Sequence, residues 1–114
     1  MNLPTSDLPV AQVKAELFKA MGHPARIRVL EALSEGERTV GEIAGMVDLE
    51  MSTLSQQLAV LRRAGVVTTR RQGNSIHYAL RDERMSQLLA IARQIIVSNL
   101  RDSREMLESL DRRP

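Results

Sequence analysis

Residues 40–64 constrain the fold more than any other segment, because they combine a short helical pattern, a turn and a second helical pattern. In the second pattern Leu54, Leu58 and Leu61 recur at i, i+4 and i+7, which places them on one buried helix face. Small, hydrogen-bonding and basic residues share the opposite face: Ser52, Gln56, Ala59 and Arg63. Such a face suits the major groove of DNA. An ordinary amphipathic helix with a solvent-facing polar side is the alternative.

The composition is typical of a small globular protein. The chain has 114 residues, of which 43% are hydrophobic and 26% charged, a balance that suits one domain with its own core. It has no cysteine, which excludes disulfides, thiolate metal sites and cysteine nucleophiles. No apolar run approaches the length of about 20 residues that a membrane-spanning helix needs. We therefore expect a cytoplasmic protein with no membrane partner.

Positive charge is concentrated in one part of the chain. Residues 1–50 contain five Lys or Arg and eight Asp or Glu, whereas residues 51–81 contain five Arg and no acidic residue. Residues 82–114 contain six of each sign. The basic segment coincides with the second helical pattern and the residues after it, as expected for a surface that binds duplex DNA. A solvated charged face is the alternative.

Helix signals precede this segment. We expect a flexible arm over residues 1–6 and then a helix that Asp7 caps and that runs to about Ala20. Pro24 suits the first turn of a second helix, because a proline there loses no intrahelical hydrogen bond. Thr39 and Glu42 have the spacing of a capping box, in which each side chain bonds the other residue's free amide at the start of a helix.

The pattern after residue 65 is extended rather than helical. Residues 66–71 and 75–80 are β-branched or alternating runs, and the Gly73-Asn74 pair between them is a hairpin signal. The polar side chains near the tip are Arg70, Arg71, Gln72 and Asn74. Such a tip suits the DNA backbone or a minor groove. A hairpin that only faces solvent is the alternative.

An apolar stripe at helical spacing predicts one long helix over about residues 82–110. At a rise of 1.5 Å per residue this helix is about 40 Å long. Shorter helices of one chain cannot cover so much apolar surface, so pairing with a second copy in a two-fold dimer is the simplest solution. A helix folded back onto its own core is the alternative. The residues expected at the dimer seam are Leu17, Phe18, Leu88, Ile95 and Ile96.

Three motifs, in this order, resemble the ArsR/SmtB family of bacterial winged-helix repressors. One is similar to the family's L-x-H/D-P-T-R-x-x-I-L opening: AMGHPARIRVL, residues 20–30. The next is similar to its S-x-V-S-x-H-L-x-x-L-x-x-A-G-L-V segment: STLSQQLAVLRRAGVV, residues 52–67. The last matches its R-x-G-x-x-x-x-Y-x-L wing: RQGNSIHYAL, residues 71–80. The resemblance covers about residues 14–97.

The resemblance implies a mainly α fold with a β-hairpin wing, a winged helix-turn-helix. Residues 7–114 would then be a single domain, with residues 82–110 as a C-terminal dimerisation helix. It further implies a homodimer formed through the first and last helices, which binds a palindromic double-stranded DNA operator as a transcriptional regulator, typically a repressor.

The chain departs from the metal-sensing members of that family. Where some carry a Cys-x-Cys pair, this chain has Thr-Val-Gly at residues 39–41, and the last helix has carboxylates but no histidine. Carboxylates alone hold soft or borderline divalent metals poorly, so we expect no metal site and no cofactor. His23 is expected to cap a helix. The alternative is a direct metal sensor that combines His77, the N-terminus and carboxylates.

The sequence favours a regulator whose signal comes from a separate sensor protein or a non-thiolate ligand, and a nickel-linked regulator is one form of that hypothesis. A winged-helix protein-interaction module is the other alternative. Catalysis is not expected, because no phosphate loop or paired base and nucleophile is present. The residues expected to contact DNA are Ser52, Thr53, Ser55, Gln56, Gln57, Arg62, Arg63, Arg70, Arg71, Gln72 and Asn74.

Overall fold

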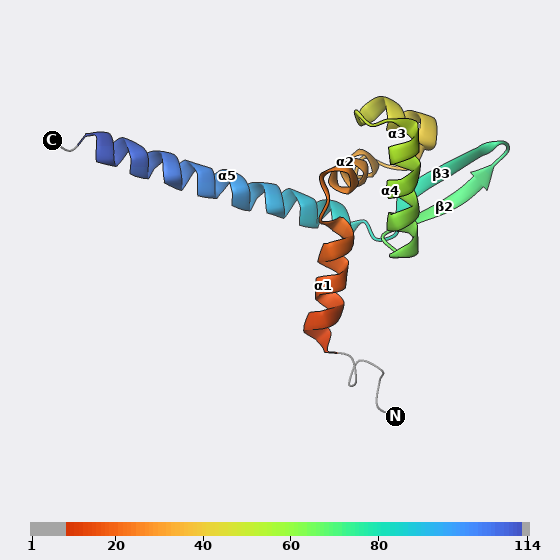
Figure 1. Ribbon diagram of the computed structural model, residues 1–114, viewed down its shortest axis with the longest axis horizontal. Helices are drawn as coiled ribbons and strands as arrows, with labels where there is room; N and C mark the ends of the chain where they lie inside the picture. The colour runs from red at the N-terminus through yellow and green to blue at the C-terminus, as the bar shows by residue number, and fades with distance from the viewer. Residues whose placement is uncertain (1–8, 113–114) are drawn as a thin grey trace. The chain divides into compact units, whose positions relative to one another are not determined.

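The computed structural model describes residues 9–112, which form five helices and three strands in two compact units, one up to Glu83 and one from Arg84 onward. The first unit contains α1 (Val10–Met21), α2 (Pro24–Leu33), β1 (Arg38–Thr39), α3 (Val40–Met46), α4 (Met51–Arg63), β2 (Val67–Gln72) and β3 (Ser75–Leu80) (Figure 1). The second is α5 (Arg84–Asp111). The expected arm over residues 1–6 lies outside the described residues.

The core of the first unit lies between the helices and the base of the sheet. The predicted stripe of α4 is confirmed, because Leu54, Leu58 and Leu61 are at most 1% exposed. They share this core with the fully buried Leu30, Ile43 and Val67. Removing a side chain of this size from water contributes about 2 kcal/mol to the free energy of folding. The stripe therefore fixes which side of α4 faces outward.

Local capping sets the starts of α2 and α3. His23 is the N-cap of α2, and its Nδ1 accepts a hydrogen bond from the Ala25 amide at 3.1 Å, which confirms its expected role. The capping box of α3 is also confirmed. The Glu42 amide donates to Thr39 Oγ1 at 3.2 Å, and the Thr39 amide donates to Glu42 Oε1 at 2.9 Å.

The first helix begins later than predicted, at Val10 with Pro9 as its N-cap instead of directly after Asp7. Its N-cap is Pro9, whose carbonyl accepts hydrogen bonds from the amides of Gln12 and Val13 at 2.9 and 3.2 Å. The backbone of Pro9 is extended, with φ −54° and ψ 130°, so Pro9 precedes the first helical residue and α1 starts after it.

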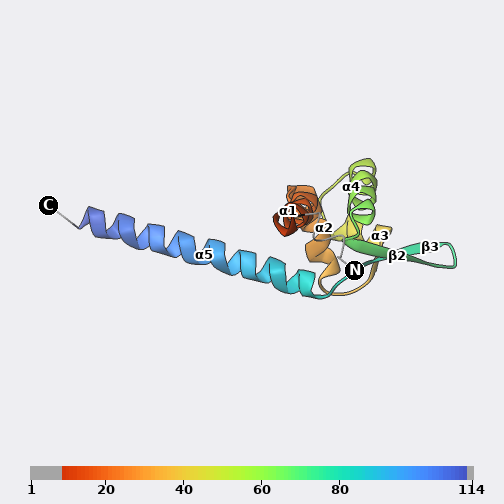
Figure 2. The same ribbon diagram turned by 90° about the horizontal axis from the view of Figure 1, so that it is seen from below.

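The sheet has three antiparallel strands in the order β1-β3-β2. The predicted β2–β3 hairpin is confirmed, with Arg70 opposite His77 and Gly73 at its tip in the left-handed region, φ +61°. The two-residue strand β1 was not predicted, and it pairs Thr39 with His77. In Figure 2 the hairpin extends beyond the helices of its unit. We call this β2–β3 hairpin the wing.

One guanidinium joins three helices. Arg26 on α2 donates from Nε to the Ala20 carbonyl at 2.6 Å and from Nη2 to the Lys19 carbonyl at 3.3 Å. These carbonyls belong to the last turn of α1, where backbone acceptors lack helical partners and a cation is favoured. Its Nη1 donates to Gln57 Oε1 on α4 at 3.0 Å. Arg26 thus ties the orientation of α4 to the end of α1.

The second unit is the long helix α5, whose 28 residues agree closely with the predicted range 82–110. None of its residues is buried, and its exposed apolar side chains include Ile95, Ile96, Leu100 and Leu107. Among residues 9–112 no helix combines the length and the apolar character needed to cross a membrane. That residues 7–114 act as a single domain remains a prediction.

The link between Arg26 and Gln57 can be tested by comparing Gln57→Ala with its neighbour Gln56→Ala. Both changes raise helix propensity equally, but only the first removes the side-chain oxygen that accepts a hydrogen bond from Arg26 Nη1. We expect Gln57→Ala to lower the free energy of unfolding by about 1 kcal/mol more than Gln56→Ala. Urea unfolding at fixed protein concentration measures the difference. Equal free energies of unfolding for the two variants would contradict this role.

Candidate nucleic-acid interface

The exposed face of α4 is defined by what the helix buries. Ser52, Ser55 and Gln56 stand at i, i+3 and i+4, on the side opposite the leucine stripe, and all three are exposed. The helix contains no acidic residue. We call these three side chains together with Arg63, which the helical period places on the same side, the polar face of α4. It offers hydroxyl and amide groups able to bond base edges or phosphates.

Two of the expected DNA contacts lie at the edge of this face. Thr53 and Gln57 are half-buried, unlike Gln56. The side-chain oxygen of Gln57 is already an acceptor for Arg26. Gln57 is expected among the base-contacting residues, but its hydrogen bond with Arg26 places it on the side of α4 that faces the rest of the fold. The structure thus separates two adjacent glutamines into an exposed and an anchored one.

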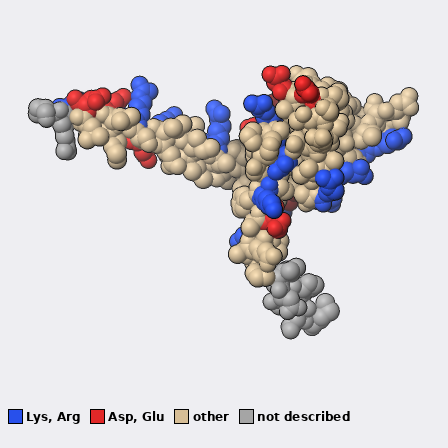
Figure 3. Space-filling view, in the orientation of Figure 1, with Lys and Arg blue, Asp and Glu red and all other residues tan. Residues whose placement is uncertain are grey.

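Basic side chains lie at the end of α4 and on the wing. Arg62 and Arg63 are exposed in the last turn of α4, where a cation is also favoured by the helix carbonyls. Figure 3 shows Lys and Arg side chains over this end of α4 and along the wing. Arg71, Gln72 and Asn74 are exposed on the wing. The basic segment of the sequence therefore forms one basic region in space.

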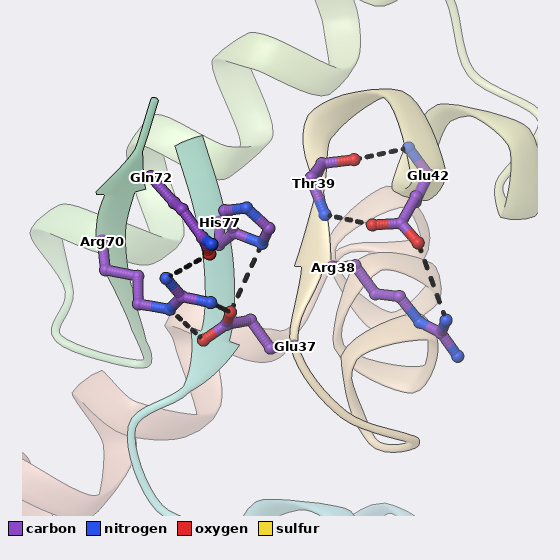
Figure 4. Close-up of polar contacts among 7 residues, drawn as sticks. All are labelled: Glu37, Arg38, Thr39, Glu42, Arg70, Gln72 and His77. Carbon is purple, nitrogen blue, oxygen red and sulfur yellow. Dashed lines mark hydrogen bonds and ion pairs between the residues drawn. The ribbon is translucent and has the colours of Figure 1, made fainter. Parts of the chain in front are cut away.

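Arg70 differs from its neighbours, because it is engaged with an acidic residue that sequence analysis missed. Its Nε donates to Glu37 Oε2 at 3.0 Å, its Nη2 pairs with Glu37 Oε1, and its Nη1 donates to Gln72 Oε1 at 2.8 Å (Figure 4). His77 Nδ1 lies 3.3 Å from Glu37 Oε1. The hydrogen bond from Arg70 lowers the pKa of Glu37, and the same bond raises the pKa of Arg70.

No signal in the linear sequence points to Glu37. It lies outside the acid-free segment 51–81 and reaches Arg70 because β1, which it immediately precedes, pairs with β3. The pairing of Thr39 with His77 and of His77 with Arg70 brings the three strands together at this point. Two residues are too few to show a strand period in a sequence.

The surroundings of His77 bear on the metal-sensor hypothesis. Its charged neighbours include Glu37 and Glu42, and the charge of Glu37 is already paired with the guanidinium of Arg70. Within residues 9–112 no group of three or more His, Cys, Asp or Glu side chains is arranged to hold a metal ion. The N-terminal residues of that hypothesis lie outside the described residues.

The side chains expected at a dimer seam are apolar and accessible in the described chain. On α1, Leu17 is 39% and Phe18 is 55% exposed. On α5, Leu88 is half-buried, while Ile95 and Ile96 are more than half exposed. Exposed apolar side chains gathered on one element are typical of protein interaction surfaces. That these side chains form a dimer seam remains a prediction.

Comparison with known proteins agrees with this architecture. Residues 23–69 match the family described as "Bacterial regulatory protein, arsR family". The chain is 50% identical over 103 residues to the HTH-type transcriptional regulator Rv0081 of Mycobacterium tuberculosis, covering 90% of each chain. The crystal structure of Rv0081 superposes with a TM-score of 0.74, covering 83% of this chain and 96% of that one.

Two further solved structures share the fold. The transcriptional repressor BigR of Xylella fastidiosa is 36% identical, with a TM-score of 0.71, over 82% of this chain and 96% of its own. Mb0332 of Mycobacterium bovis, described as a homodimeric winged helix-turn-helix DNA-binding domain, is 26% identical, with a TM-score of 0.73, over 87% of this chain and 91% of its own. The winged helix-turn-helix fold is thereby confirmed, and the chain belongs to the ArsR family of bacterial regulatory proteins.

Proposed function

We propose that this transcriptional regulator binds a palindromic DNA operator as a homodimer, through the polar face of α4 and the wing. The observation that carries the proposal is the orientation of α4. Its leucines are buried, so Ser52, Ser55 and Gln56 are exposed on a helix that has no acidic residue. Family membership supports the same use of this helix.

The proposed contacts follow from the chemistry of each position. Gln56 can form two hydrogen bonds to an adenine edge, and the short hydroxyls of Ser52 and Ser55 suit base edges or nearby phosphates. Arg62 and Arg63, at the far end of α4, suit phosphates, which position a protein without selecting sequence. Arg71 and Asn74, both exposed on the wing, would meet the adjacent backbone or minor groove.

Dimerisation would explain the exposed apolar side chains. α1 and α5 each present such residues, among them Phe18, Ile95 and Ile96. The relative Mb0332 is described as homodimeric, and a two-fold dimer is the commonest closed assembly. Two copies of α4 would then address half-sites about one helical turn, roughly 34 Å, apart on the duplex.

The signal that this regulator answers is proposed to come from a separate sensor protein or a non-thiolate ligand. The chain has no cysteine, and within residues 9–112 no three or more His, Cys, Asp or Glu side chains are arranged to hold a metal ion. We propose no catalytic step, because the relatives are named as transcriptional regulators, which act by binding. Binding to chromosomal DNA would place the protein in the cytoplasm.

DNA reading is tested with a duplex enriched by the wild-type protein from a random-sequence library. We expect Gln56→Ala to reduce discrimination between this duplex and a scrambled one by about 1–3 kcal/mol. We expect Arg63→Ala to weaken binding to the enriched and the scrambled duplex nearly equally, because a phosphate contact carries no sequence information. The same change should reduce the dependence of affinity on salt concentration. Fluorescence anisotropy at several salt concentrations measures both effects.

Failure of the folded wild-type protein to enrich any duplex would contradict the DNA-binding proposal. A winged-helix module that binds only protein would give that result. A Gln56→Ala variant that discriminates as well as the wild type would contradict the assignment of base contact to this face of α4.

Dimerisation is tested with Ile96→Glu and its control Gln94→Glu, which adds the same charge on the opposite side of α5. We expect Ile96→Glu to weaken dimerisation by at least about tenfold, because it places a carboxylate in an apolar interface. Gln94→Glu should leave dimerisation nearly unchanged. Sedimentation equilibrium measures the dimer dissociation constant, and equal values for the two variants would contradict the proposed seam.

A further inference from the structure

Arg70 and Arg71 are neighbours in the sequence but lie on opposite faces of the wing, because successive side chains of a strand alternate. Arg71 shares its face with Val67, which is fully buried toward the helices at the base of the same strand. Arg70 shares the other face with Gln72 and with its cross-strand partner His77. The two arginines therefore have different surroundings although they are adjacent in the sequence.

Glu37 occupies Arg70 on that second face. Two nitrogens of the guanidinium meet the two carboxylate oxygens, and a third bonds Gln72 (Figure 4). This two-point pairing is the geometry in which an arginine also holds a phosphate. A phosphate can gain these donors only if they leave Glu37, whose negative charge would then stand unpaired near the DNA. The carboxylate and the duplex thus compete for one side chain.

The other neighbours of Glu37 show that the contact lies at the junction of the three strands. His77 Nδ1 is 3.3 Å from the same carboxylate, and His77 pairs across β3 with both Arg70 and Thr39. Arg71 is exposed and has no ion-pair partner within residues 9–112. The wing therefore presents one available guanidinium, although its sequence contains two.

We propose that Glu37 withholds Arg70 from the DNA backbone and uses it to fix the base of the wing, so that Arg71 carries the wing's phosphate contact. This inference deepens the proposed function and rests on it. Arg70 is then a positioning residue, and Glu37 sets how strongly the affinity for DNA depends on salt. The same pairing engages the side-chain oxygen of Gln72, which accepts from Arg70, so Gln72 can offer DNA only its amide N–H donors.

The salt dependence of binding separates the two arginines. Each phosphate contact contributes about 0.9 to the slope of log K against log salt concentration. On the duplex enriched from the random library, we expect Arg71→Ala to reduce the slope by about 0.9 per wing. The double variant Glu37→Gln/Arg70→Ala, which removes the ion pair and leaves no unpaired carboxylate near the DNA, should reduce it by less than half as much. A reduction in this double variant equal to that in Arg71→Ala would overturn the proposal.

A variant that gains a contact gives the opposite test. Glu37→Gln keeps the size of the side chain and removes its charge, which frees Arg70 for the backbone. We expect the slope to increase by up to about 0.9 per wing, and the increase to disappear in the double variant Glu37→Gln/Arg70→Ala. An unchanged slope in Glu37→Gln, or an increase that persists in the double variant, would overturn the proposal.

A measurement without DNA distinguishes failure of this inference from failure of the proposed function. Thermal unfolding of Glu37→Gln, Arg70→Ala and the double variant forms a double-mutant cycle for the free protein. Non-additive shifts in Tm are expected, and additive shifts would show that the pair does not fix the wing. If the Tm shifts are non-additive but the protein binds no duplex, Glu37 and Arg70 do interact and the proposed DNA binding is wrong. The proposal that Glu37 withholds Arg70 from phosphate then fails with it.

Discussion

Burial of the leucine stripe on α4 is the interaction on which the rest of the structure depends. Leu54, Leu58 and Leu61 occupy the core, and a rotation of the helix by one residue position, about 100°, would move them toward solvent and bring polar side chains inward. Burying such polar groups without partners costs free energy, so the rotation of α4 has one favourable value. Exposure of Ser52 and Gln56 is a direct consequence. The candidate interface therefore follows from the core.

Segments with a strong period or an explicit cap could be predicted from the sequence. The stripe of α4, the long helix α5, the wing and the Thr39–Glu42 capping box all have such signals, and the structure confirms them. The predicted start of α1 is too early, because Pro9 has an extended backbone and stands as the N-cap, which the apolar pattern does not show. Strand β1 was missed because two residues carry no period.

The candidate interface was predictable only where helical geometry decides it. The outward position of Gln56 follows from spacing, whereas the different fate of Gln57 depends on Arg26, which is 31 residues away in the sequence. The charge distribution shows the same limit. Residues 51–81 contain no acidic residue, yet Glu37 neutralises Arg70 after the strands pair. Contacts between distant segments decide both cases, and a linear pattern does not contain them.

The absence of cysteine makes a direct test of the central claim possible, because a single introduced thiol can carry a DNA-cleaving iron chelate. Chelates are attached at Ser52→Cys on α4 and at Asn74→Cys on the wing. The control is Glu31→Cys on α2, because Glu31 is exposed and the other side of α2 packs against α4. If α4 and the wing bind the duplex, the first two labels cleave it at symmetric positions in and beside each half-site, and the third does not. Equal cleavage from all three labels, or cleavage from the Glu31→Cys label alone, would contradict the claim that α4 reads DNA.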